Sequence, residues 1–415
     1  MRWCRLLPFV LLVSFAVHAD EQPLSLEEAV QQALQTAPQL SARAESASAA
    51  QALVVSAGRL PDPELIVGID NLPVTGPDAY STTSDFMTMR KVGVMQEFPR
   101  ARKRELQHDR AEAEAGVANA ELIQARLDVA REVATAWIRR ATAEASLKDL
   151  QALEPEVALQ AAAARAALSA GRSSTAEALA AEAAVAQLAN RILKMRGEAR
   201  QAADELSRWI DVDPARPLAA MPSLDRLPAP PETLLGSVHE HGSLLPYESR
   251  LAAARTDVDL ARAERRPDWS AELAFAKRGP EFSDMVSLQF RIGLPVFTKN
   301  RQNPLISAKH AELRRIEAER ADELRMHTAE LRKMLTEWEL LGEQLEQYEQ
   351  DLLPLARERS RASLASYRAG RGDLRLALDA YREEIDFVIE HAQLQNERGR
   401  AWAFLRYLGP QHLHP

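Results

Sequence analysis

The sequence predicts a mainly helical protein with a few short β-strands, built from an internal two-fold repeat. The 415 residues are 46% hydrophobic but only 5% aromatic, and much of the apolar content is alanine, a strong helix former that buries little area. Apolar residues recur at heptad spacing over long stretches, as in packed helices. Similar blocks of sequence also occur twice, in the same order. The net charge of −8 argues against a nucleic-acid partner, which would favour a basic face.

The first 19 residues have the pattern of a secretory signal peptide. Two arginines precede an apolar stretch, residues 6–17, and Ala19 ends a cleavage motif, so we expect cleavage after Ala19. A buried N-terminal helix is the alternative. The apolar stretch is too short to span a membrane, and no later stretch reaches the length that a spanning helix needs. The single cysteine, Cys4, lies in this segment, so we expect no disulfide, thiolate ligand, cysteine nucleophile or N-terminal lipid anchor in the mature chain.

The remaining sequence predicts two copies of one unit, residues 20–210 and 237–415, joined by a linker at 211–236. Each copy has a helical run that ends before a proline, then two strand-like segments, a basic tract and a long helical hairpin. The helical runs are residues 26–59 and 244–266. The segment 211–236 contains six prolines, so we expect a linker or a small cap at the equator, with neither a helix nor a central strand.

The long hairpins carry the same marks in both copies. A basic tract, at residues 98–104 or 295–301, begins each long helix. Each helix contains a proline, Pro155 or Pro354, and a Gly-Arg pair follows sixteen residues later, so the offset stays constant at 199 residues. We expect the glycines of these pairs to be turn residues at the hairpin tips. They are Gly171 and Gly370.

Heptad seams run along the long helices, which predicts coiled-coil packing with a left-handed supercoil. Apolar residues follow one another at alternating intervals of three and four residues, and we expect the aromatic residues among them to be packing residues. The seam of the first copy consists of Ile123, Leu127, Ala130, Ala134, Trp137 and Ala141. The seams of the second copy consist of Leu324, His327, Leu331, Met334, Trp338, Leu341, Leu345, Tyr348 and Leu352, and of Leu374, Leu378, Tyr381, Ile385, Val388 and Ala392.

Four segments alternate apolar and polar residues and predict β-strands. They are residues 64–70, 87–98, 269–275 and 285–294. One apolar and one polar face over about 9–11 residues is typical of a membrane β-strand, although a soluble, half-buried sheet gives the same alternation. The apolar faces consist of Leu65, Val67 and Ile69, of Val92 and Val94, of Trp269, Ala271, Leu273 and Phe275, and of Val286, Leu288, Phe290, Ile292 and Leu294.

The secretory signal and the number of strands favour the membrane interpretation. Four strands cannot close a barrel, open strand edges are not tolerated in lipid, and bacterial single-chain barrels begin at eight strands. Several chains must therefore contribute, and three copies would give twelve strands in a closed ring. The same symmetry would arrange the long helices as a hollow tube. We therefore expect a homotrimer in contact with outer-membrane lipid.

The order of these elements resembles the outer-membrane efflux protein family, the TolC-like proteins, over nearly the whole mature chain. The most specific likeness is the segment Tyr367–Ala380, which follows the family pattern Tyr-x-x-Gly and then Leu-Asp-Ala. The joint Pro295–Gln302 and a short first extracellular loop are similar to the heavy-metal branch, the CzcC-like proteins. The resemblance implies a trimer with a β-barrel in the outer membrane and an α-helical coiled-coil barrel across the periplasm. It also implies two partners, a periplasmic adaptor protein and an inner-membrane pump of the resistance-nodulation-division (RND) class.

The resemblance further implies a gate where the inner helices meet at the periplasmic tip. Asp379 matches the gate aspartate of the family, and in a trimer it would form a ring of three carboxylates, which attracts cations. Tyr367 matches the tyrosine that helps to hold the tip shut. The third gate residue, Arg371, lies one position before the family's arginine, which is replaced by Gly372.

Two further features of this segment bear on the role of Asp379. Leu376 stands where relatives often carry a second acid, so the family's second acidic ring lacks its carboxylate here. Asp379 also has an arginine four residues before it, Arg375, and another three residues after it, Arg382. An ordinary exposed carboxylate paired with either arginine is therefore the alternative to a gate residue.

The other chemistry-bearing residues predict no catalytic site, no cofactor and no metal site. Three methionines, Met87, Met89 and Met95, could suggest a soft copper(I) site, but we expect them to pack on a strand. The sequence contains no Gly-x-Ser-x-Gly and no His-Glu-x-x-His motif. Two pairs of histidines are too few for a zinc site, and we expect them to be solvated loop residues. They are His239 and His241 beside the linker, and His412 and His414 at the C-terminus.

Together with these features, the resemblance implies a passive exit duct in the outer membrane, part of a tripartite RND-type efflux system for divalent heavy-metal cations. The choice of cargo rests on the resemblance. One alternative is a drug or organic-compound channel of the same family. A second is a periplasmic coiled-coil adaptor, which would need lipoyl-like and barrel segments between its two hairpin helices. A third is a secreted enzyme, which would need a convergent catalytic set.

Overall fold

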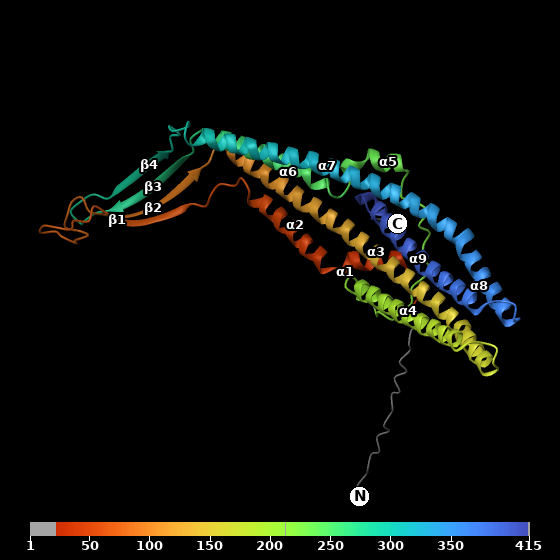
Figure 1. Ribbon diagram of the computed structural model, residues 1–415. Coiled ribbons are helices and arrows are strands. Elements are labelled where there is room, and N and C mark those ends of the chain that lie inside the picture. Colours follow the sequence, from red (N-terminus) through yellow and green to blue (C-terminus); the bar gives the residue numbers. More distant parts are fainter. Residues whose placement is uncertain (1–21, 212, 414–415) are drawn as a thin grey trace, which may run out of the picture. The chain divides into compact units, whose positions relative to one another are not determined.

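A computed structural model describes residues 22–211 and 213–413 (Figure 1). The predicted signal peptide and His414 lie outside the described residues. The chain's internal contacts divide it into two compact units, and each unit draws on both sequence copies. One unit comprises residues 22–33, 133–224 and 344–399, and the other comprises 34–132, 225–343 and 400–413. The repeat is therefore a unit of sequence, whereas each unit of packing combines both copies.

Both copies have the same order of elements, namely helix, two strands and a long helical hairpin. The first copy consists of α1 (Leu26–Thr36), α2 (Pro38–Ser56), β1 (Glu64–Asp70), β2 (Met89–Phe98), α3 (Ala101–Ser169) and α4 (Thr175–Ser207). The second consists of α6 (Leu245–Ala263), β3 (Trp269–Lys277), β4 (Met285–Ile292), α7 (Gln302–Gln347), the π-helix η2 (Tyr348–Leu352), α8 (Leu353–Arg368) and α9 (Leu374–Arg406). The remaining elements are α5 (Pro231–Gly236) and the 3₁₀-helices η1 (Val238–Glu240) and η3 (Pro410–His412).

Prolines explain two differences from the predicted elements. The run predicted at 26–59 is two helices, because Pro38 begins α2 and leaves Ala37 before it in an extended conformation. The linker was predicted to contain no helix, and this is wrong at its end. Pro231 occupies the first turn of the short helix α5, where the N–H that proline lacks would have no partner in any case. By contrast, α3 continues through Pro155.

The predicted seam of the second copy is wrong at its first position, Leu324, which is 40% exposed, and it is wrong again after the π-helix begins. Leu341 and Leu345 are buried as predicted, but the next fully buried positions are Leu353 and Ala356, whereas Leu352 is only half-buried. A π-turn accommodates one extra residue, so η2 moves the buried face of the helix on by one position. In the first copy, Leu127, Ala130, Ala134 and Trp137 are buried, as the heptad pattern predicts.

Two of the buried clusters show how each unit packs. In the first unit, apolar side chains from α3, α4, α8 and α9 pack together, among them Leu150, Leu188, Leu353 and Ile385. In the second unit, Leu331 packs with α5 and with the end of the chain, including Leu405. No described helix combines the length and the apolar character that would let it cross a membrane.

The four strands form one antiparallel sheet in the order β1-β2-β3-β4 (Figure 1). All four predicted strands are present, although β2 begins at Met89 instead of Met87. The register places Val94 opposite Leu65 and also opposite Leu273, which in turn lies opposite Leu288. Residues that face each other across antiparallel strands point to the same side of a sheet, so these four residues share one face.

Candidate functional site

One face of the sheet is a continuous apolar surface that is exposed in the single chain. The register brings the apolar positions of all four strands to this side. Val67 is 72% exposed, Leu273 58% and Phe290 62%. Such an area on a soluble monomer would be unusual, because large exposed apolar patches normally mark a contact surface. The alternating pattern matches that of strands that face lipid, and β2 and β3, with 10 and 9 residues, also have the length of membrane strands.

Aromatic side chains lie together at the end of this face where β2 ends and β3 begins. The rings of Phe98 and Trp269 stack at 4.3 Å between centroids, and Trp269 lies 6.3 Å from Phe290 in a tilted arrangement. Tryptophan and other amphipathic rings are enriched at the level of lipid headgroups. The cluster therefore lies where an interfacial belt would be expected if the apolar face contacts a membrane.

The opposite face carries an ionic network that joins three strands. The Glu272 carboxylate of β3 lies 2.6 Å from Lys91 Nζ of β2 and accepts a hydrogen bond of 2.7 Å from Arg291 of β4. Its side chain is only 3% exposed. Removing one partner of a buried, hydrogen-bonded charge leaves the others uncompensated. The network therefore favours one register among β2, β3 and β4.

The sheet ends in two edges that have no neighbour among the described strands. In the order β1-β2-β3-β4, β1 pairs only with β2 and β4 only with β3. Unpaired strand edges combined with an apolar face are not stable in lipid, because every backbone N–H and C=O needs a partner there. The sheet is therefore incomplete as a membrane structure until further strands join it.

A charged joint fastens the start of α3 to the start of β3. Asp268 accepts a hydrogen bond of 3.0 Å from the backbone N–H of Arg100 and one of 2.9 Å from Lys103 Nζ. Arg100 also donates to the carbonyl of Pro267, at 3.0 Å. Burial raises the pKa of Asp268, but the hydrogen bonds from Lys103 and Arg100 more than offset this, so its pKa is below the usual value. The basic tract noted in the sequence thus fixes how the helix follows the strand.

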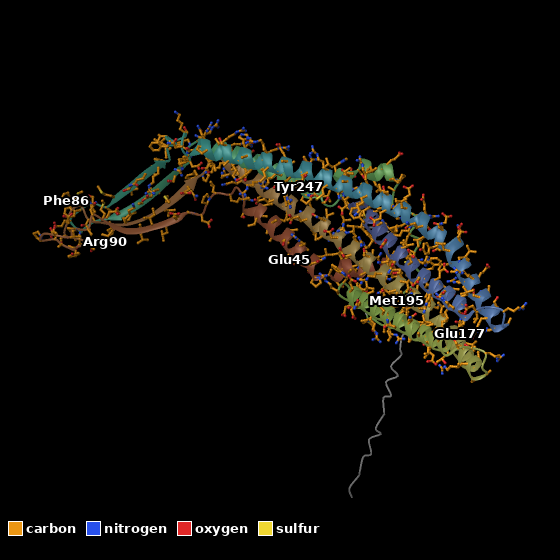
Figure 2. All side chains as sticks on the ribbon, viewed as in Figure 1. Glu45, Phe86, Arg90, Glu177, Met195 and Tyr247 are labelled. Carbon is orange, nitrogen blue, oxygen red and sulfur yellow. The ribbon has the colours of Figure 1, made fainter. Side chains whose placement is uncertain are left out.

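The two hairpin tips have the same backbone geometry. Gly171 and Gly370 take φ values of +68° and +69°, in the left-handed region that favours glycine. The N–H of the next residue returns to a carbonyl five positions earlier, as in a Schellman motif. At the first tip, Ser174 caps α4 in a capping box with Glu177, which is visible at that end of α4 (Figure 2). The hydrogen bonds from Ser173 and Ser174 lower the pKa of the Glu177 carboxyl.

The three predicted gate residues differ in how buried they are and in their neighbours. Tyr367 is half-buried against an apolar cluster that includes Ala161 and Leu378, and this burial raises the pKa of its hydroxyl. Arg371 is exposed in the tip turn. Among the described contacts, Asp379 lies 3.4 Å from Arg382 and 4.0 Å from Arg375.

In the single chain, Asp379 thus has the surroundings of an ordinary exposed carboxylate that is paired with nearby arginines. Its side chain is 47% exposed, so both ion pairs are weak and screened. The same exposure leaves the carboxylate accessible to solvent and to other chains. Leu376, one turn before it on α9, is 61% exposed although it is apolar.

A buried polar cluster near the tip was not predicted from the sequence. The Tyr381 hydroxyl of α9 donates to the Glu156 carboxylate of α3. The Ser360 hydroxyl of α8 donates to the Glu384 carboxylate of α9 at 2.5 Å, and both of these residues are buried. Burial, followed by the bond to Glu156, raises the pKa of Tyr381. The one signal in the sequence was Tyr381, a residue with a polar hydroxyl on an otherwise apolar seam.

Comparison with known proteins tests these observations independently. The model of the family described as outer membrane efflux protein matches residues 29–210. By sequence, the likeness to this family is therefore limited to the first sequence copy. The match covers the first helices, β1, β2 and the hairpin α3–α4 of this chain. No curated protein matches its sequence significantly.

Solved structures match both sequence copies of the chain. The outer-membrane channel OprN is 19% identical, with a TM-score of 0.79 over 94% of this chain and 90% of that chain. The outer membrane protein VceC from Vibrio cholerae is 19% identical, with a TM-score of 0.78 over 92% and 96%. CusC, a protein that forms a transmembrane channel, is 16% identical, with a TM-score of 0.77 over 92% of each chain. The chain thus has the fold of these outer-membrane channels along nearly its whole length.

Proposed function

We propose that three copies of this chain form a passive exit duct in the outer membrane, whose cargo is divalent heavy-metal cations. The observation that carries the proposal is the sheet, which exposes a continuous apolar face and two unpaired edges. Pairing β4 of one copy with β1 of the next would satisfy both edges. Three such contacts give a closed ring of twelve strands, within the range of known outer-membrane barrels.

The proposed duct needs partners that supply energy and reach the inner membrane. The family resemblance supports a periplasmic adaptor protein and an inner-membrane RND pump in these roles. In this arrangement the signal peptide is cleaved after Ala19, the sheet lies in the lipid, and the long helices extend into the periplasm. The chain itself acts as a conduit and has no enzymatic role.

Oligomeric state gives the most direct test of the proposed architecture. We expect the full chain to remain in the membrane fraction until detergent is added and to migrate as a trimer when it is not boiled. The physical reason is the sheet, since its edges are satisfied only between copies. A protein that is monomeric and soluble in buffer without detergent would refute the duct and favour a periplasmic adaptor or a secreted protein.

The preferred cargo rests on the joint Pro295–Gln302, which is similar to that of the heavy-metal branch. We expect deletion of the gene to raise sensitivity to zinc, cobalt or cadmium several-fold, and to change sensitivity to dyes and antibiotics much less. Minimum inhibitory concentrations, with the gene restored from a plasmid as control, would measure this. Sensitization mainly to dyes and antibiotics would instead assign the duct to drug or organic-compound efflux.

The proposed gate is a ring of three Asp379 carboxylates at the narrow end of the helical tube, supported by the tip turn and by Tyr367 and Arg371. Asp379→Asn should weaken block of single-channel current by divalent cations several-fold in planar bilayers, because the ring loses its charge. Arg382→Gln should have the opposite effect, because it removes a cation 3.4 Å from that carboxylate.

A matched control for the gate experiment is available on the same helix. Glu383 is paired with Arg359 of α8, and Glu383→Gln removes a carboxylate four positions from Asp379. We expect this variant to leave the block unchanged. Equal block in the wild type and in Asp379→Asn would remove Asp379 from the gate, without affecting the trimer itself.

A further inference from the structure

One of the histidines beside the linker is deeply buried, contrary to the expectation from the sequence. His241 is fully buried, whereas the side chain of His239 is 65% exposed. His241 lies in the segment Val238–Leu244, which leads from η1 into α6. Val238 and Leu244 pack in the same apolar cluster as Leu331 and Leu405. The position of this segment explains the difference, since it passes through the interior of its unit.

The segment is fixed on three sides. Gly242 donates its backbone N–H to the carbonyl of Leu408, at 2.9 Å, which ties the segment to the end of the chain. A Cβ atom at Gly242 would lie only 2.8 Å from the Leu127 side chain of α3, so the segment passes close to this helix. The third contact is with α7, where the His241 ring meets His327.

The two imidazoles form a direct contact. His241 Nδ1 lies 2.9 Å from His327 Nε2, and the rings meet edge to face at 5.2 Å between centroids. His327 is itself only 7% exposed and lies 6.1 Å from the Phe404 ring. A nitrogen–nitrogen contact of this length requires one N–H and one lone pair. This holds whichever ring is the donor.

Protonation changes this contact in a defined order. A neutral pair has one N–H between the rings, and a singly protonated pair can keep that bond. A doubly protonated pair places two N–H groups and two positive charges against each other in a buried site, and it must separate. The contact is therefore compatible with at most one added proton.

The charged groups around the pair come from three elements. On α7, Glu330 Oε2 lies 3.9 Å from His327 Nδ1, and Glu323 also acts on this ring. On α3, Arg131 lies over the Phe404 ring and opposes protonation. In the segment itself, Glu240 is paired with His239 and is 61% exposed. On α9, the neighbouring side chain is the uncharged Phe404.

Burial is the largest influence on His327 and lowers its pKa below 6.5, although Glu330 and Glu323 act in the other direction. The folded protein then binds fewer protons than the unfolded chain just below pH 6.5. Stability from this group is fully present above about pH 6.5 and is lost as the pH falls through the folded pKa.

We propose that the His241–His327 contact is an acid-sensitive fastening that releases the segment Val238–Leu244, with α5, from α7 when both rings are protonated. The fastening acts within one unit and does not depend on the proposed cargo. The fastening gives a role to His241, a buried histidine just after the linker that takes no part in the proposed duct.

The experiment measures the distance between α5 and α7 in the full chain in detergent. Spin labels would be placed at Glu232→Cys on α5 and Arg332→Cys on α7, in a Cys4→Ser background, and compared by pulsed electron paramagnetic resonance between pH 7.5 and pH 4.5. We expect a single short distance at pH 7.5 and a growing longer population on acidification. The ratio of the two populations should change by up to about tenfold per pH unit for each proton taken up.

Two variants separate the pair from other acid effects. With His241→Gln and His327→Gln combined, the distance should no longer depend on pH, because neither side chain titrates in this range. His310→Gln, at a half-buried histidine elsewhere on α7 that contacts Arg262, should respond like the wild type. A wild-type distance that stays constant down to pH 4.5 would overturn the proposal without any histidine variant. The same transition in the double variant would overturn it as well.

Discussion

An arginine in place of Leu288 is expected to abolish assembly of the trimer in the membrane, whereas an arginine in place of the neighbouring Gln289 is expected to be tolerated. Leu288 is 61% exposed on the apolar face, opposite Leu273. Placing an arginine on the lipid face of a barrel costs roughly 2–4 kcal/mol near the bilayer midplane. The proposed trimer would carry this cost three times, once in each copy.

Gln289 is a close control because it differs from Leu288 by one position and by the face that it occupies. It lies opposite Glu272 on the polar face, where a further positive charge meets a carboxylate. Membrane fractionation and migration of the unboiled protein would report assembly for both variants. Equal yields of trimer from Leu288→Arg and Gln289→Arg would show that the apolar face is not in lipid.

The second large effect is expected for Trp137→Ala, which should lower the free energy of unfolding by about 3–5 kcal/mol. Trp137 is fully buried in α3, and its indole N–H donates to the carbonyl of Leu24, at 3.1 Å. Alanine would leave a large cavity in the packed helices. It would also remove one of the bonds that hold the first described residues of the chain in place.

Trp137→Phe separates packing from hydrogen bonding. Phenylalanine keeps much of the buried surface and loses only the donor, and the carbonyl of Leu24 still accepts from the N–H of Ala219, at 2.9 Å. We therefore expect a loss of about 1 kcal/mol for this variant. Denaturant unfolding of the detergent-solubilised protein, followed by circular dichroism, would compare the two. If both variants lose the same amount, the packing argument for Trp137 is wrong.

The fold was predictable from the sequence where the physical signal is local. Alternation of apolar and polar residues identified the four strands, and heptad spacing identified the seam of Leu127 and Trp137. The seam was wrong beyond Leu345, because nothing in the spacing marks where a helix takes a π-turn. The density of prolines around Pro231 predicts a linker, but proline is also a favoured first residue of a helix.

The buried polar contacts, in the candidate site and elsewhere, were less predictable because they join residues that are far apart in the sequence. His241 and His327 are 86 positions apart, and Tyr381 and Glu156 are 225 apart. The sequence showed each of these residues but not its partner. For Asp379 the local partners were predictable, because Arg375 and Arg382 lie at helical spacing from it. A ring of carboxylates could not be tested in this way, because it depends on other copies of the chain.

The unpaired edges of the sheet also bear on how the protein is made. A barrel formed by one chain can close by adding hairpins in sequence, so no finished edge has to wait for a partner. Here each copy completes its own strand order at β1 and β4, with an apolar face already exposed. Between secretion and insertion, that surface is a template for aggregation. In the proposed assembly, association of the three copies must therefore precede or accompany entry into lipid, and its rate should depend on the concentration of newly secreted chains.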